Sequence, residues 1–150
     1  MKNNIFWLTG QPGSGKTTIA LQLIETLKDS NIMHIDGDDL RDLTSNKDYS
    51  RQGRINNITL AQKIALFCSN KGFFVIVSLV APFKDIRDAF KKNNSVTEFY
   101  LHTDEVRGKE EFFSKDYEAP SENFISIDTG VNTIDECVSI VMKELEKKST

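Results

Sequence analysis

Two patterns of hydrophobic and polar positions follow one another along this chain. Short runs that are almost wholly apolar predict buried strands at residues 5–9, 32–35, 73–79, 96–101 and 124–127. Between these runs, apolar residues recur every three or four positions, which predicts helices that bury one face. Strands and helices that alternate in this way predict an α/β fold, with a parallel five-stranded sheet and helices on both of its faces.

Four helical segments are well marked by apolar residues at helical spacing. In chain order these residues are Ile19, Ala20, Leu23, Ile24 and Leu27; Ile58, Ala61, Ile64, Ala65 and Cys68; Phe83, Ile86 and Phe90; and Ile134, Cys137, Val138, Val141 and Leu145. Pro82 is expected in the first turn of the third helix, where a missing N–H is tolerated. Thr133 and Glu136 have the spacing of a capping box and predict the start of the last helix.

The segment 103–123 interrupts this alternation. It is polar and has neither helical nor strand periodicity, so we expect a mobile loop or lid there. The chain contains no repeat, low-complexity tract or Pro/Gly-rich linker. Residues 1–150 are therefore predicted to form a single domain.

A glycine-rich stretch, LTGQPGSGKTTIA at 8–20, joins the first strand to the first helix. It contains G-x-x-x-x-G-K-T, the pattern of a phosphate-binding loop, in the strand–loop–helix context which that motif needs. Because Pro12 has no N–H, the amides that cradle the phosphates are expected from Gly13 to Thr17. Lys16 is expected to reach the β- and γ-phosphates, and the Thr17 hydroxyl to bind Mg²⁺. The motif predicts a P-loop NTPase fold that binds a nucleotide.

The residues after each strand carry the candidate chemistry, because ligands of parallel sheets bind beyond the carboxyl ends of the strands. Asp36 and Asp38 follow the second strand, where a carboxylate can position magnesium or accept the proton of an attacking hydroxyl. An Asp-rich turn that caps the next helix is the alternative for both. The third strand ends in Ser78, with no carboxylate before Asp85. That absence disfavours a switch-type or motor-type ATPase and assigns the acidic role to Asp36 and Asp38.

Cationic residues gather in sequence around the same strand ends. They are Arg41, Arg51, Arg54, Lys84 and Arg87. A guanidinium fork suits a second anionic group beyond the phosphate-binding loop, although each cation taken alone also fits a solvated surface position. Asn57 follows Arg54 by three residues on the same helical face, so the two are expected to hold one ligand together.

Composition narrows the classes of partner. A net charge of −3 provides no positive field over the whole domain, so no nucleic-acid partner is expected. No membrane partner is expected either, because no apolar run approaches the roughly 20 residues that span a bilayer. The N-terminal MKNN leads directly into the first strand without room for a signal peptide, which favours a cytoplasmic location. Cys68 and Cys137 have no Cys or His at metal-ligand spacing and are expected as buried thiols.

Six stretches together resemble the adenylylsulfate kinase family. In the family's order they are FWLTGQPGSGKTTIA, DGDDLR, YSRQGRINNI, VSLVAPFKDIRD, DYEAP and IDTG, and they cover nearly the whole chain apart from 103–116. The resemblance implies transfer of the γ-phosphate of ATP to the 3′-hydroxyl of adenylyl sulfate, with Mg²⁺ as cofactor. Family members commonly form homodimers, so the resemblance also implies a possible homodimer.

The resemblance further implies a role for individual residues. It implies that the catalytic residues are Lys16, Asp36 and Asp38, and that the residues that bind the metal are Thr17 and Asp36. The positions that match ATP-binding residues are Gly13, Ser14, Gly15, Lys16, Thr17, Thr18, Arg107, Asp128 and Thr129. The positions that match acceptor-binding residues are Asp38, Arg41, Arg54, Asn57, Val80, Ala81 and Lys84.

The lid departs from the family's pattern. The family's lid carries a helix, a Lys-Gly-Leu-Tyr-Lys stretch and an aromatic that closes over the acceptor base, whereas TDEVRGKEEFFSKDYEAP is much shorter. Arg107 and Lys109 correspond to the first basic residues of that lid, and Phe112 or Phe113 to its aromatic. Three functions stay open at this point. They are adenylylsulfate kinase, the related cytidine diphosphoramidate kinase with the same chemistry on another acceptor, and a catalytically weak nucleotide-binding regulator.

Overall fold

A computed structural model describes residues 4–148. Its five strands are β1 (Ile5–Thr9), β2 (Ile32–Asp36), β3 (Phe74–Ser78), β4 (Val96–His102) and β5 (Ile125–Asp128). All pairings are parallel, in the order β2-β3-β1-β4-β5. The predicted parallel five-stranded sheet is confirmed, and each strand lies within a residue or two of its apolar run.

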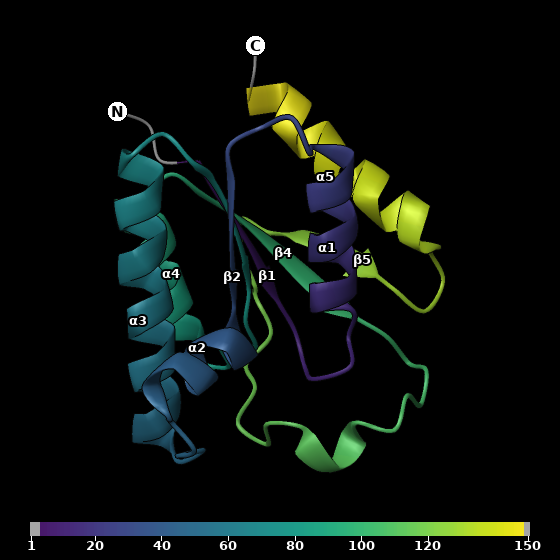
Figure 1. Ribbon diagram of the computed structural model, residues 1–150. Helices are drawn as coiled ribbons and strands as arrows, with labels where there is room; N and C mark the ends of the chain where they lie inside the picture. The colour runs from purple at the N-terminus through teal and green to yellow at the C-terminus, as the bar shows by residue number, and fades with distance from the viewer. Residues whose placement is uncertain (1–3, 149–150) are drawn as a thin grey trace.

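Helices cover both faces of the sheet (Figure 1). They are α1 (Lys16–Thr26), α2 (Gly37–Thr44), α3 (Arg51–Asn70), α4 (Lys84–Asn93) and α5 (Ile134–Lys148), with one 3-10 turn, η1 (Glu110–Phe112). Helices α3 and α4 lie on one face and α1 and α5 on the other (Figure 1). No helix within residues 4–148 is long and apolar enough to cross a membrane.

The central strand β1 divides the core into two clusters. Ile5 and Trp7 point toward the α3/α4 face, whereas Phe6 and Leu8 pack on the α1/α5 face. A strand buried on both faces must be apolar at consecutive positions, which is why the run IFWLT has no polar–apolar alternation.

Two details of the helices differ from expectation. Helix α4 begins at Lys84, so the prediction that Pro82 lies in its first turn is wrong. The N-cap Phe83 is extended, with φ −98° and ψ 110°, and its side chain is buried. Ile134 was expected in the core but is 49% exposed, because it is the first residue of α5 and its side chain precedes the buried stripe. The capping box is confirmed, since Thr133 N–H donates to Glu136 Oε1 and Glu136 N–H to Thr133 Oγ1. Cys68 and Cys137 are buried free thiols, as predicted.

Candidate active site

The carboxyl ends of the five strands gather candidate residues at one edge of the sheet. The phosphate-binding loop follows β1, the DGDDLR turn follows β2, and the lid segment 103–123 follows β4. In Figure 1 the loop, α2 and the lid lie together at the lower end, opposite both termini. The topology therefore brings the candidate residues together at the edge where ligands of parallel sheets bind.

Lys16 is folded back over the phosphate-binding loop. Its Nζ donates to the carbonyl oxygens of Gly10 and Gln11, at 2.9 Å each. Burial lowers the pKa of this ammonium from 10.5 to about 8, although the nearby charges of Asp36 and Asp38 oppose that shift. The lysine is thus desolvated and held by neutral acceptors, in a place where an anion would bind it more strongly.

Asp36 is the centre of a hydrogen-bonded chain across two strands. Its Oδ1 accepts from Thr17 Oγ1 at 3.0 Å and from Ser78 Oγ at 2.7 Å, and Ser78 Oγ lies 2.8 Å from His34 Nε2. Its Oδ2 accepts from the N–H of Asp38, which makes Asp36 the N-cap of α2. Both interpretations of the acidic turn therefore apply to this residue: it caps a helix and it faces Thr17 of the phosphate-binding loop.

Asp38 and Asn57 are placed differently from Asp36. The Asp38 carboxylate is exposed and accepts no hydrogen bond from residues 4–148. Asn57 is 5% exposed, and its Nδ2 donates to Gly37 O at 3.4 Å. Among the described residues its Oδ1 has no partner, and a buried acceptor without a donor is uncommon. The pair leaves one free carboxylate and one unsatisfied amide oxygen beside the acidic turn.

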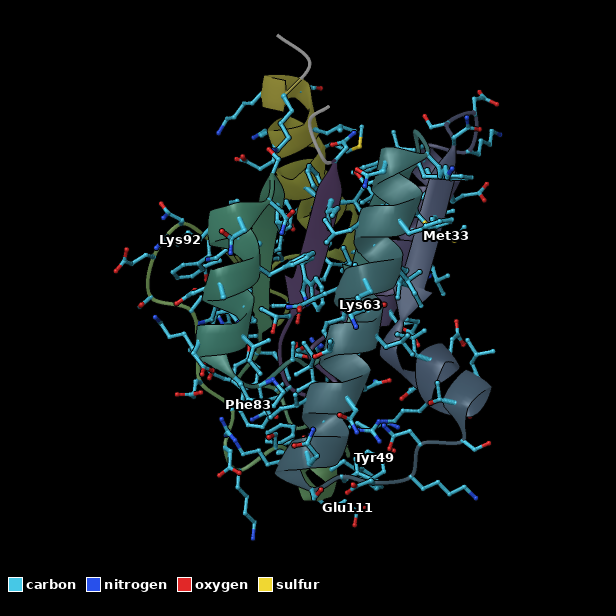
Figure 2. All side chains as sticks on the ribbon, turned by 90° about the vertical axis from the view of Figure 1, so that its left-hand side faces the viewer. Met33, Tyr49, Lys63, Phe83, Lys92 and Glu111 are labelled. Atoms are coloured by element: carbon cyan, nitrogen blue, oxygen red, sulfur yellow. The ribbon has the colours of Figure 1, made fainter. Side chains whose placement is uncertain are left out.

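Two of the predicted acceptor-binding arginines meet at Tyr49. The guanidinium carbon of Arg41 lies 3.9 Å from the centre of the Tyr49 ring, and that of Arg54 lies 5.7 Å from it. Arg54 Nε also donates to Tyr49 O at 2.9 Å. The ring is 60% exposed and lies at the same end of α3 as Phe83 (Figure 2). The result is a cationic surface with an aromatic face in front of the acidic turn.

The predicted acceptor loop, Val80 and Ala81, is held by its carbonyl oxygens. Val80 O accepts from Thr9 Oγ1 at 2.6 Å, and Ala81 O accepts from Arg87 Nη1 at 2.6 Å. Ala81 has φ +45°, a left-handed conformation that is uncommon for a residue with a Cβ. Lys84 is not brought to the arginines, because its Nζ is paired with Asp88 at 2.7 Å on α4.

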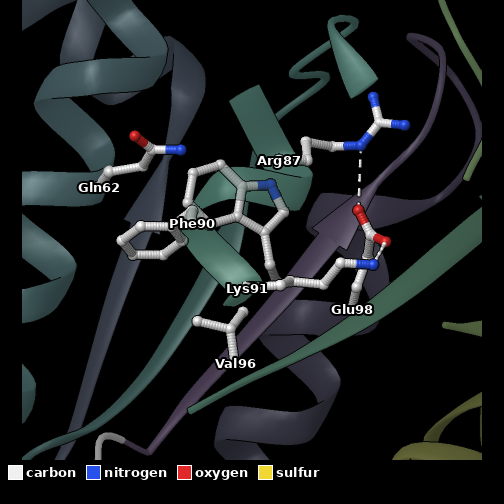
Figure 3. Close-up of a pocket in the computed structure, with 7 residues that line it drawn as sticks. Gln62, Arg87, Phe90, Lys91, Val96 and Glu98 are labelled. Carbon is white, nitrogen blue, oxygen red and sulfur yellow. Dashed lines mark hydrogen bonds and ion pairs between the residues drawn. The ribbon is translucent and has the colours of Figure 1, made fainter. Parts of the chain in front are cut away.

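Arg87 belongs to a buried ion network with Glu98 and Lys91 (Figure 3). Its Nε lies 3.0 Å from Glu98 Oε2, and the two side chains are 3% and 2% exposed. Lys91 Nζ lies 2.6 Å from Glu98 Oε1. Arg87 Nη2 also donates to the carbonyl oxygen of Glu118 in the lid. One buried cation therefore fixes the acceptor loop and the lid relative to β4.

Three predicted ATP-binding residues outside the loop lie at its border. Arg107 Nη1 donates to Gly13 O at 3.0 Å, and its Nη2 donates to Thr129 O at 2.9 Å. Thr129 Oγ1 donates to Ser14 O at 2.6 Å. Asp128 instead organises its own turn, since its Oδ1 accepts from the N–H groups of Gly130 and Val131.

Reasoning from the sequence missed several residues of this site. Ser78 was noted only as a missing carboxylate, yet the parallel register places it beside Asp36. His34, Tyr49 and Gln11 were not candidates. Tyr49 could have been found from the sequence, because it is an aromatic residue that lies between Arg41 and Arg54 in the chain. Gln11 could not, because its side-chain contacts with the lid join positions 103 residues apart and leave no local pattern in the sequence.

Comparison with known proteins identifies the family. The family model for adenylylsulphate kinase sequences matches residues 2–133 of this chain. The chain belongs to the adenylylsulphate kinase family. It is therefore a phosphotransferase with a nucleotide-binding P-loop.

Two relatives and one solved structure illustrate the range of similar proteins. The chain is 33% identical to the cytidine diphosphoramidate kinase of Campylobacter jejuni, covering 97% of this chain and 99% of that protein. It is 29% identical to the adenylyl-sulfate kinase of Clostridium kluyveri, covering 96% and 84%. The APS kinase of Mycobacterium tuberculosis, solved with AMPPNP and APS, shares the fold with a TM-score of 0.82, 21% identity and coverage of 97% and 98%. The two sequence alignments run over 168 and 167 positions, more than the 150 residues of this chain, so both relatives contain residues that this chain lacks.

Proposed function

We propose that this chain is an ATP-dependent kinase that transfers the γ-phosphate to the 3′-hydroxyl of a nucleotide, with adenylyl sulfate as the acceptor. One observation carries the proposal. Lys16, the Thr17–Asp36 pair and the uncommitted carboxylate of Asp38 meet at one sheet edge, and Arg41 adjoins that edge. A phosphate-binding loop supplies the donor side of this edge, and the arginines supply an anion-binding acceptor side.

The donor side fits ATP with Mg²⁺. Mg²⁺ keeps most of its waters and is bound through one or two protein oxygens plus substrate phosphates. Thr17 Oγ1 and Asp36 Oδ1, 3.0 Å apart, suit that use, and residues 4–148 contain no larger cluster of His, Cys, Asp and Glu that would compete for the ion. When bound, Mg²⁺ neutralises charge on the phosphates. Lys16 would exchange its contacts with Gly10 O and Gln11 O for the β- and γ-phosphates.

The acceptor side assigns different tasks to the two aspartates. Asp36 is committed to Thr17, Ser78 and the start of α2, so we place it on the metal side. Asp38 is unpaired and accepts the proton of the 3′-hydroxyl. The hydroxyl oxygen forms a bond to the γ-phosphorus while the bond from that phosphorus to the bridging oxygen of ADP breaks. Arg41, Arg54 and Asn57 hold the acceptor in line.

Cytidine diphosphoramidate is a second candidate acceptor, favoured by a specific observation. The relative that bears this name matches the chain over 99% of its own length, whereas the adenylyl-sulfate kinase of Clostridium kluyveri matches over 84%. The short lid favours neither acceptor, because both relatives are longer than this chain across the aligned region.

The test is a coupled assay of ADP release with ATP and Mg²⁺, in which each acceptor is offered separately at equal concentration. We expect strong stimulation by adenylyl sulfate. Stimulation by the cytidine compound alone would replace the acceptor and keep the chemistry. If neither acceptor raised turnover above background, kinase activity at a nucleotide hydroxyl would be refuted and a nucleotide-binding regulator would take its place.

Two variants examine the two sides of the site. Lys16→Ala is expected to abolish turnover. Arg54→Ala is expected to raise KM for the acceptor by about ten- to a hundredfold, as for loss of one charge-assisted contact, with KM for ATP nearly unchanged. Lys63→Ala on α3 is the matched control for loss of a cation. An unchanged acceptor KM in Arg54→Ala would show that the acceptor surface is assigned wrongly.

A further inference from the structure

The lid segment 103–123 contacts the phosphate-binding loop through the side chain of Gln11. Gln11 Nε2 donates to Ser114 O at 2.9 Å, and Ser114 N–H donates to Gln11 Oε1 at 2.9 Å. A side-chain amide and a main-chain residue thus make the reciprocal pair of hydrogen bonds that two strands make in a sheet. Ser114 is only 5% exposed, so the Ser114 side of this pair is buried.

The same part of the lid touches the loop again at Gly13. Arg107 Nη1 donates to Gly13 O, and a Cβ on Gly13 would lie 3.0 Å from Cβ and Cγ of Lys109. Gly13 also has φ +82°, so the close approach and the backbone both require glycine there. Arg107 and Lys109 therefore lie directly against the loop.

Residues 107–114 form a compact turn with its own hydrogen bonds. The Glu110 carboxylate accepts from the N–H groups of Arg107 and Gly108, both at 3.1 Å, and these bonds lower the pKa of Glu110. Phe112 N–H donates to Lys109 O at 2.9 Å. A turn with this internal bonding is positioned by its two ends, which are Arg107 at one side and Ser114 at the other.

Packing alone does not hold the Ser114 end in place. A cavity of about 100 Å³ is lined by residues of the loop, β4 and the lid, among them Gln11, Tyr100, His102 and Phe113. Side chains beside a void lose packing contacts on that side. The Gln11–Ser114 hydrogen bonds therefore attach this end of the turn to the phosphate-binding loop, while Tyr117 and Glu118 further along the lid bind Thr9 and Pro82.

We propose that Gln11 is a positioning residue for phosphoryl transfer: by pairing with Ser114 it holds Arg107 and Lys109 against the phosphate-binding loop. The inference rests on the kinase function proposed above. Gln11 connects the lid to the catalytic lysine as well, because Gln11 O accepts from Lys16 Nζ. A lid held in this way places its cations beside the phosphates and limits the access of water to the γ-phosphate.

The pair can be broken from either partner. Gln11→Ala removes both hydrogen bonds, and Gln11→Glu keeps an acceptor for Ser114 N–H but removes the donor. Ser114→Pro removes the N–H without changing the phosphate-binding loop. Phe113 has ψ 138°, a conformation that a residue before proline prefers, so this substitution causes no strain on that side. Ser114→Ala keeps both main-chain groups and is the matched control.

Amide hydrogen exchange in the nucleotide-free chain measures the attachment directly. Gln11→Ala is expected to accelerate exchange of amides in 107–116 by about tenfold or more, and Ser114→Pro likewise for the amides that remain, as expected for loss of one or two hydrogen bonds. Ser114→Ala is expected to exchange like the unmodified chain. Unchanged exchange in both Gln11→Ala and Ser114→Pro would overturn the attachment, whatever the activity.

The ratio of ATP hydrolysis without acceptor to phosphoryl transfer with acceptor measures the positioning role. We expect this ratio to rise in Gln11→Ala and Ser114→Pro, with a fall in kcat and little change in KM for the acceptor. Faster exchange with an unchanged ratio would overturn the role in phosphoryl transfer. If the unmodified chain phosphorylated no acceptor, the proposed function would have failed instead, and the exchange data would still decide whether Gln11 holds the lid.

Discussion

Replacement of Arg87 by Met is expected to cause a large loss of stability. The side chains of Arg87 and Glu98 are 3% and 2% exposed, and removal of one partner of a buried ion pair costs about 3–5 kcal/mol. Arg87 also donates to Ala81 O and to the carbonyl oxygen of Glu118, so the substitution leaves two further acceptors without this donor. For a chain of this length, a loss of that size lowers Tm by roughly 6–20 °C.

Thermal and urea unfolding of the nucleotide-free chain provide the measurement. Lys84→Met on the same helix is the control, since the Lys84 and Asp88 side chains are 32% and 40% exposed, and Tm should stay within about 2 °C of the unmodified value. The double variant Arg87→Met/Glu98→Met should be more stable than Arg87→Met alone, because in the single variant the buried Glu98 carboxylate keeps only Lys91 as its counter-ion. A loss below about 1 kcal/mol in Arg87→Met, or a double variant less stable than the single one, would refute the reasoning.

Three further predictions concern the site and the last helix. The pKa of Lys16 is lowered to about 8, and only the protonated form of this lysine pairs with phosphates. The affinity for ATP, measured by calorimetry, should therefore fall as the pH rises above 8. An affinity that stays constant up to pH 9.5 would contradict this prediction. The same shift has a definite sign for stability: the unfolded chain keeps this proton up to 10.5, so the contribution of Lys16 to the free energy of unfolding should increase between pH 8 and 10.5. Asp38→Asn should lower kcat by about 10²–10⁴-fold, with little change in the Mg²⁺ concentration that gives the half-maximal rate. Asp36→Asn should instead raise that Mg²⁺ concentration. The reverse pattern would make Asp36 the proton acceptor and Asp38 the residue on the metal side. Glu136→Ala removes half of the capping box and should lower Tm by a few degrees, with Glu146→Ala at the other end of α5 as control.

The sequence was sufficient for the parts of the fold that depend on local pattern. Predominantly apolar runs identified all five strands, and the clearest runs belong to β1 and β3, which are buried at every position. The phosphate-binding loop and the capping box of α5 were found by the fixed spacing of a few residues. Each of these signals lies within a stretch of about twenty residues.

What could not be predicted depends on contacts between distant positions. The left-handed Ala81 and the extended Phe83 move the start of α4 beyond Pro82. The partners of this turn include distant residues: Pro82 O accepts from the N–H of Glu118 in the lid, and the centre of the Phe83 ring lies 4.1 Å from the guanidinium carbon of Arg51 on α3. The sequence left open which of Asp36 and Asp38 acts on the acceptor hydroxyl, and the contacts of Asp36 with Thr17 and Ser78 are what distinguish the two. Lys84 was grouped with the arginines by its position in the chain, but its ammonium pairs with Asp88.

The central place of β1 has a consequence for the order in which the chain can fold. Ile5 to Leu8 pair with Val75 to Ser78 on one side, and Ile5 to Thr9 pair with Val96 to Tyr100 on the other. These contacts close loops of some 70 to 90 residues, and such long closures make folding slow compared with that of helical bundles. During synthesis, β1 is made about 70 residues before β3, the first strand with which it pairs. Until β3 is available, the apolar side chains of β1 have no strand partner and are exposed to aggregation. Chaperone binding is therefore expected to matter most in this interval.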